Sequence, residues 1–168
     1  GLIESYWYEQ QHIYSTNFDQ RPHFGNYYRF IQGIPLNNGN YIDAQSISSN
    51  IYLRVLGQKD LINQRAHLWI QNINHTWRNV LNGVIIPPVS ATITVPGLTP
   101  NTSYQVEWWD TYAPVATVTQ TETIQTDTSG NLILSVANLT TDTAVRISLL
   151  ILPSATPTPT PLPAPVVS

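Results

Sequence analysis

The 168-residue sequence contains no cysteine and no methionine, and only 10% of its residues are charged. Soluble domains average about 25% charged residues, so the surface must be built largely from Ser, Thr, Asn and Gln. Without cysteine, neither a disulfide framework nor a Cys-containing zinc site can form. The missing sulfur side chains fit an oxidising, exposed environment, and chance in a short chain explains them equally well.

Few charges also limit the partners that the chain can bind. The formal net charge is −3, and the basic residues are six scattered arginines and the single Lys59. No basic stripe is available to neutralise phosphates, which argues against nucleic-acid binding. The longest apolar run, around residues 149–152, is far below the ~20 residues of a membrane span.

The sequence begins at Gly1 without an initiator Met or a basic and apolar leader. We therefore expect either a processed mature chain or an excised piece, located outside the cell or at its surface.

Short apolar runs separated by turn residues dominate the middle of the chain. The alternation of Tyr104, Val106 and Trp108 points one side of a strand toward a core. This pattern predicts an all-β, immunoglobulin-like antiparallel sandwich spanning residues 37–152. The expected strands are 41–48, 51–56, 66–71, 91–95, 104–109, 116–124, 132–136 and 145–152.

The flanking segments differ from this pattern. Residues 1–36 carry aromatic residues at helical spacings, and Arg21-Pro22 and Gly25 predict a break into short helices that form an N-terminal arm. One further helical turn is expected at 76–81, with Trp77 and Leu81 capping the end of the sandwich. Residues 153–168 form a Pro/Thr-rich extended tail that cannot build a core.

The sequence contains no recognisable catalytic or metal-binding motif. The four histidines show no metal-ligand spacing, and no nucleophile elbow, phosphate loop or catalytic triad is visible. Glu107 and Asp110 flank two tryptophans, but they lie on opposite pleats of one strand, and we expect one solvated carboxylate and one turn residue. The sequence thus predicts a non-enzymatic protein without cofactor or metal.

Adjacent Trp108 and Trp109 face opposite sides of their predicted strand, so one of them is expected in the core. Three explanations remain open for the other: local cover, a subunit contact, or a platform on which a sugar stacks. Glycosylation sites form a second group of surface candidates. They are Asn74, Asn101 and Asn138 in Asn-x-Ser/Thr triplets, and Thr156, Thr158 and Thr160 as O-glycan acceptors.

Two stretches, GQKDLINQRAHLWIQNINHTWRNV (57–80) and ITVPGLTPNTSYQVEWWDTY (93–112), resemble the C-terminal β-sandwich of secreted bacterial glycoside-hydrolase-like proteins. The likeness covers about residues 41–152. In that family the catalytic carboxylates sit on a preceding barrel, which has no counterpart here. The resemblance therefore implies ancestry without activity, and no catalytic residue carries over.

The alternating prolines of the tail leave every remaining N–H, from Thr156 to Ala164, on one side of an extended chain. Such a segment serves either as a spacer or as a strand that binds along one edge. We expect a non-catalytic extracellular structural subunit that self-assembles into a filament, with the tail and the arm contacting neighbouring subunits. The alternative is a carbohydrate-binding accessory module of a secreted glycosidase. The expected subunit contacts are Trp7, Tyr14, Phe24, Tyr28, Thr156, Thr158, Thr160, Leu162, Val166 and Val167.

Overall fold

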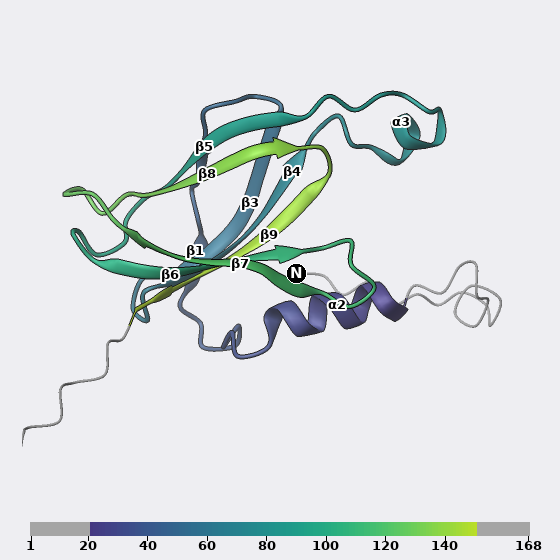
Figure 1. The fold of residues 1–168 in the computed structure, drawn as a ribbon. Helices are drawn as coiled ribbons and strands as arrows, with labels where there is room; N and C mark the ends of the chain where they lie inside the picture. The colour runs from purple at the N-terminus through teal and green to yellow at the C-terminus, as the bar shows by residue number, and fades with distance from the viewer. Residues whose placement is uncertain (1–20, 151–168) are drawn as a thin grey trace, which may run out of the picture.

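The computed structural model describes residues 21–150, which form two packed antiparallel sheets with a helix across the outer face of the larger one (Figure 1). This confirms the prediction of an all-β sandwich. The larger sheet has the order β1 (Tyr41–Asp43), β3 (Leu53–Asp60), β4 (Arg65–Asn72), β9 (Asp142–Leu149), β6 (Ser103–Asp110), β7 (Thr117–Gln125). The smaller sheet has the order β2 (Ile47–Ser48), β5 (Val89–Val95), β8 (Leu132–Leu139).

The core lies between the two sheets and follows the period-2 alternation of the strands. Tyr104, Val106 and Trp108 of β6 all point into it, as the sequence predicts, and so do Leu132 and Leu134 of β8. Removing such side chains from water contributes about 25 cal/mol per Å² of apolar surface. The residues between them in β6 and its neighbours face outward, and this outer face of the larger sheet carries α2.

The predicted single strand 41–48 is wrong, because the chain changes sheets within it. β1 pairs with β3 in the larger sheet, whereas β2 pairs with β5 in the smaller one. Gln45 has a φ of 54° and its N–H is bound by the Asp43 carboxylate, so the pleat is broken between the two strands. Local backbone chemistry thus ends a run that the apolar pattern continues.

Helix α2 (Arg21–Ile31) is continuous through Gly25, which corrects the predicted break there. The predicted break at Arg21-Pro22 stays a prediction, because α2 begins at Arg21 and the preceding residues lie outside the described part. Pro22 lies in the first turn of the helix, where backbone N–H groups have no intrahelical acceptor. The N–H that proline lacks therefore costs no hydrogen bond there. Tertiary contacts outweigh the cost of about 1 kcal/mol for Gly25. Asn26 binds both the Ala113 carbonyl (2.9 Å) and the Ala116 N–H (2.8 Å), which fixes the helix to the loop before β7.

Helix α3 (Trp77–Leu81) forms at the predicted turn, with the Thr76 hydroxyl accepting from the Asn79 N–H. Its predicted packing is wrong: Trp77 is 72% and Leu81 75% exposed, and the helix buries no residue. Figure 1 shows α3 beyond the ends of the strands, in the connection between β4 and β5, too far out to cap the sandwich. We call this end of the sandwich the α3 end.

Within residues 21–150, no helix is long and apolar enough to cross a membrane. The predicted contacts Trp7 and Tyr14, and the whole tail 153–168, lie outside the described residues.

Candidate functional site

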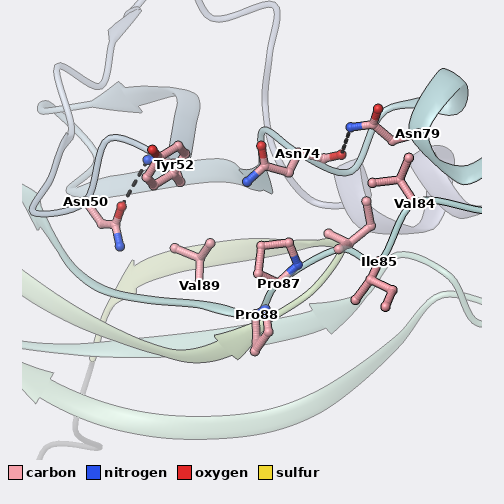
Figure 2. Close-up of a pocket in the computed structure, with 10 residues that line it drawn as sticks. Asn50, Tyr52, Asn74, Asn79, Val84, Ile85, Pro87, Pro88 and Val89 are labelled. Carbon is pink, nitrogen blue, oxygen red and sulfur yellow. Dashed lines mark hydrogen bonds between the residues drawn. The ribbon is translucent and has the colours of Figure 1, made fainter.

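A cleft of about 530 Å³ opens at the α3 end, between the turn after β2 and the connection from β4 to β5 (Figure 2). Its lining combines amide side chains with apolar ones. The lining residues are Asn50, Tyr52, Asn74, Asn79, Val84, Ile85, Ile86, Pro87, Pro88 and Val89. Val89 also belongs to the hydrophobic core, so the cleft is continuous with the rigid part of the sandwich.

Asn72, at the end of β4, holds the walls of this cleft together. It is fully buried, and its Nδ2 donates to the carbonyls of Pro87 (2.8 Å) and Leu139 (3.0 Å). Its Oδ1 accepts from the Asn74 N–H at 3.0 Å. Because a buried amide is costly unless it is hydrogen-bonded, this arrangement fixes both connecting segments relative to the sheets.

Some polar groups in the cleft are hydrogen-bonded within the protein, and others are not. Asn79 Nδ2 donates to the Asn74 carbonyl (2.8 Å), and Asn50 Oδ1 accepts from the Tyr52 N–H (3.0 Å), as Figure 2 shows. Within residues 21–150, neither the Asn74 carboxamide nor the Tyr52 hydroxyl has a hydrogen-bond partner. Both remain able to bind a ligand.

The rim of the cleft is apolar and exposed. Ile85 in the lining is 90% exposed, and Ile51, between the lining residues Asn50 and Tyr52, is 84% exposed. Trp77 and Leu81 of α3 lie in the same β4–β5 connection as Ile85. Single exposed apolar side chains are common, but a contiguous group of large ones marks a binding surface. Arg78 is the one charged residue of α3, and its guanidinium lies 5.4 Å from the centre of the Trp77 ring. The cleft is therefore suited to an uncharged ligand.

Trp108 and Trp109 are both covered. Trp108 is 9% exposed, and its Nε1 donates to Glu122 Oε1 at 2.7 Å. The partly buried Trp109 meets Phe30 of α2 edge-on, with ring centres 5.7 Å apart, and the Arg146 guanidinium lies 5.6 Å from its ring centre. Of the three explanations for the outward tryptophan, these contacts fit local cover, and neither ring forms an open platform.

A second, smaller cavity of about 70 Å³ lies beneath the connection from α2 to β1. It is lined by Tyr41, Arg65, His67, Glu107 and Arg146, among others. Burial, assisted by the charge of Arg146, lowers the pKa of His67, and burial raises the pKa of Tyr41. Among residues 21–150, the Tyr41 hydroxyl, Arg65 Nε and His67 Nδ1 are buried without a hydrogen-bond partner; ordered water commonly satisfies such atoms.

The two carboxylates beside the tryptophans point to different partners. Glu107 lies 3.8 Å from Arg146, whereas Asp110 accepts from the N–H groups of Tyr112 and Ala113 and stabilises a turn. Asp110 has the turn role expected from the sequence, whereas Glu107 is only partly exposed and pairs with Arg146. In the described part of the chain, no three His, Asp or Glu side chains converge as metal ligands.

The structure places the remaining sequence candidates at the surface. Phe24 is 43% and Tyr28 62% exposed on α2. Asn101 and Asn138 are exposed at positions of positive φ, at a turn and at the end of β8. Asn74 is only half-buried but lies in the wall of the cleft, so a glycan on Asn74 would fill it.

Sequence reasoning did not identify the cleft. The signal lies in residues 84–88, where Val, Ile, Ile, Pro and Pro follow Gly83. An apolar run that includes two prolines cannot pair as an inner strand, so it either packs as a loop or stays exposed.

The described fold defines an all-β sandwich protein with one neutral, apolar-rimmed cleft. No protein-family model matches the chain, and neither a curated protein nor a solved structure is significantly similar to it.

Proposed function

We propose that this protein is a non-catalytic extracellular structural subunit that self-assembles into a filament, with its tail and N-terminal arm contacting neighbouring subunits. The observation that carries the proposal is the exposed apolar surface at the α3 end. Trp77, Leu81 and Ile85 each leave more than 70% of their surface in water. Such a surface gains free energy when a partner covers it.

The low charge supports self-association. Interfaces between subunits are depleted in charged residues because each buried charge must lose its water. With 10% charged residues, most faces of this protein can meet a second copy without that penalty. The exposed aromatic residues of α2, Phe24, Tyr27 and Tyr28, supply a further apolar surface on the arm.

The direction of the chain favours a filament over a closed dimer. β9 begins beside the α3 end, where Asp142 pairs with Gln71, and it ends at Leu149, whose N–H binds the Gln64 carbonyl at the opposite end. The end of β9, after which the chain continues into the tail sequence, and the apolar surface therefore lie at opposite ends of the described sandwich. Contacts between unlike surfaces repeat from copy to copy and generate open assemblies unless a ring closes.

The same proposal includes the fold family of the sandwich, its relation to known modules and its glycosylation. We regard the sandwich as immunoglobulin-like and as related to the C-terminal module of bacterial glycoside-hydrolase-like proteins. The antiparallel pairing of strands in two layers supports an immunoglobulin-like fold. The two described sheets have six and three strands, whereas those of constant-type immunoglobulin domains have four and three. Glycans on the exposed Asn101 and Asn138 would accord with an extracellular location.

Deleting residues 153–168 tests the proposal. The full-length protein is expected to form filaments visible by negative-stain electron microscopy and to scatter light increasingly with concentration. The deletion variant is expected to remain small under the same conditions, with an unchanged circular dichroism spectrum. Unaltered assembly of the deletion variant, or a wild-type monomer at high concentration, contradicts the proposal.

A carbohydrate-binding accessory module is the second candidate. The cleft favours it by placing Tyr52 beside the amides of Asn50 and Asn74, since sugars bind to aromatic rings and amide groups. This function predicts saturable binding of a polysaccharide that is lost on Tyr52→Ala but retained on Trp109→Ala. Loss on Trp109→Ala alone would instead support the sugar platform considered from the sequence.

A further inference from the structure

Residues 153–168 have the chemistry of a polyproline ligand. The segment contains six prolines and no ionisable side chain. Each proline keeps its carbonyl but lacks an N–H, so the segment has more acceptors than donors and favours the polyproline II conformation. A binding site for it must supply apolar contacts for the rings and hydrogen-bond donors for the carbonyls.

The cleft at the α3 end supplies both. Val84, Ile85 and Pro88 form an apolar wall, and Figure 2 shows them on one side of the opening, with Asn50, Tyr52 and Asn74 across from them. The Asn74 carboxamide and the Tyr52 hydroxyl are the donors that remain without partners within residues 21–150. No acidic or basic side chain lines the cleft, which agrees with an uncharged ligand.

The course of β9 favours a second copy as the source of the ligand. The eight residues of β4 separate the Gln64 end of the sandwich from the cleft by about 26 Å, at about 3.3 Å per residue. β9 runs away from the cleft over this length, and Leu150 is fixed by its N–H to the Ser103 carbonyl (3.1 Å). Sixteen residues of polyproline helix span about 50 Å. Because β9 leads away from the cleft, binding in the cleft of the same copy would require the chain to reverse, whereas binding in the cleft of the next copy would not.

We propose that the cleft of one subunit binds residues 153–168 of a second copy of this chain as a polyproline II helix. This inference rests on the proposed self-assembly and names its acceptor surface. Repetition of the contact links subunits head to tail. Because the Asn74 carboxamide takes part, a glycan on Asn74 and a bound tail exclude each other.

A labelled peptide of residues 153–168 tests the acceptor surface on the full-length protein, held dilute so that subunits are separate. Fluorescence anisotropy is expected to show saturable binding that Ile85→Asp weakens at least about tenfold. Ile62→Asp is the matched control, because Ile62 is 76% exposed in the turn between β3 and β4, at the other end of the sandwich; its affinity is expected to stay within about twofold. Absent binding, or equal loss in both variants, overturns the inference.

A second peptide separates groove binding from strand addition. Thr160→Pro removes one N–H from the side that a paired strand would use, whereas a polyproline helix makes no use of that N–H. We expect affinity within about twofold of the original peptide; losing a strand hydrogen bond would lower it by about five- to tenfold. The larger loss overturns the inference in favour of pairing with an edge strand such as β7.

Assembly measurements keep this inference apart from the proposed function. If wild type and Ile85→Asp both form filaments, the cleft is not the acceptor and the inference fails, while self-assembly stands. If the wild type stays monomeric at every concentration, the proposed function fails and the inference with it. Binding of the peptide only after residues 153–168 are deleted would show the tail in its own cleft, which also overturns the inference.

Discussion

At the scale of single residues, a few buried polar side chains fix the loops to the sheets. Lys59, the chain's only lysine, is 2% exposed, and its Nζ donates to the Pro96 carbonyl at 2.7 Å. Burial lowers the pKa of Lys59. The Thr126 hydroxyl similarly donates to the Thr99 carbonyl at 2.6 Å. Each of these buried groups makes a hydrogen bond to a loop carbonyl in place of the hydrogen bonds to water that it loses on folding.

Tyr104 joins the core to the turn before β6. Its fully buried hydroxyl accepts from the Thr99 N–H at 3.1 Å and donates to the Gln64 side-chain oxygen. We expect Tyr104→Phe to lower the free energy of unfolding by about 0.5–1.5 kcal/mol, because it removes the hydrogen bonds of the buried hydroxyl while the Thr99 N–H still donates to the Gln64 side chain. Urea denaturation measures this change. Tyr52→Phe is the control: its half-exposed hydroxyl has no partner within residues 21–150, and we expect less than about 0.5 kcal/mol.

Asp60 makes stability depend on pH. Burial alone would raise its pKa, but hydrogen bonds from Asn63, Asn38 and the Ile62 N–H outweigh burial and lower it below 3.8. A lowered pKa contributes stability that is present above pH 4 and lost as the pH falls through the folded-state value. We expect Asp60→Asn to lower the free energy of unfolding at pH 7. The variant should also lose less stability than the wild type as the pH falls below 4. Urea midpoints between pH 2 and 7 test it, and parallel curves for wild type and variant would contradict it.

At the scale of elements, two glycines with the same backbone angle distinguish strain from crowding. Gly39 and Gly130 both have a φ of 77°. A Cβ on Gly39 would meet nothing within 4 Å, whereas one on Gly130 would lie 2.1 Å from the Leu98 carbonyl oxygen. We expect Gly39→Ala to cost about 1–2 kcal/mol from the backbone alone, and Gly130→Ala about 3 kcal/mol or more. Thermal unfolding tests this difference, and equal losses would contradict it.

Most strands could be predicted from the sequence, because alternation and turn residues are local. β6, with Tyr104, Val106 and Trp108 inward, is one example. The crossing between sheets at Ala44 and Gln45 could not be predicted, since it depends on which strand pairs with each side of the break. The continuous α2 was missed for a related reason: its contacts through Asn26 and Phe30 lie about 80 to 90 residues away in the sequence.

At the scale of the whole molecule, the chemistry of the contacts sets the response to salt. Screening weakens charge pairs over about 10 Å at 0.1 M salt, but no side chain that lines the cleft and none in residues 153–168 is charged at neutral pH. We expect the association constant to change by less than about twofold between 0.05 and 1 M NaCl, and sulfate to strengthen it. Sedimentation velocity over this range tests it. Dissociation by NaCl would indicate that charge pairs hold the assembly.

The sequence by itself determined the all-β class and the inward side of strands such as β6, because these follow from side-chain alternation along one strand. It also determined the neutral character of the surface, which is a property of composition. Only the tertiary structure decided that α2 covers Trp109, that Trp77 and Leu81 project into solvent, and that Asn50, Asn74 and Ile85 enclose one cleft. The physical reason is that covering and enclosure depend on distances between segments far apart in the chain, which no local pattern specifies.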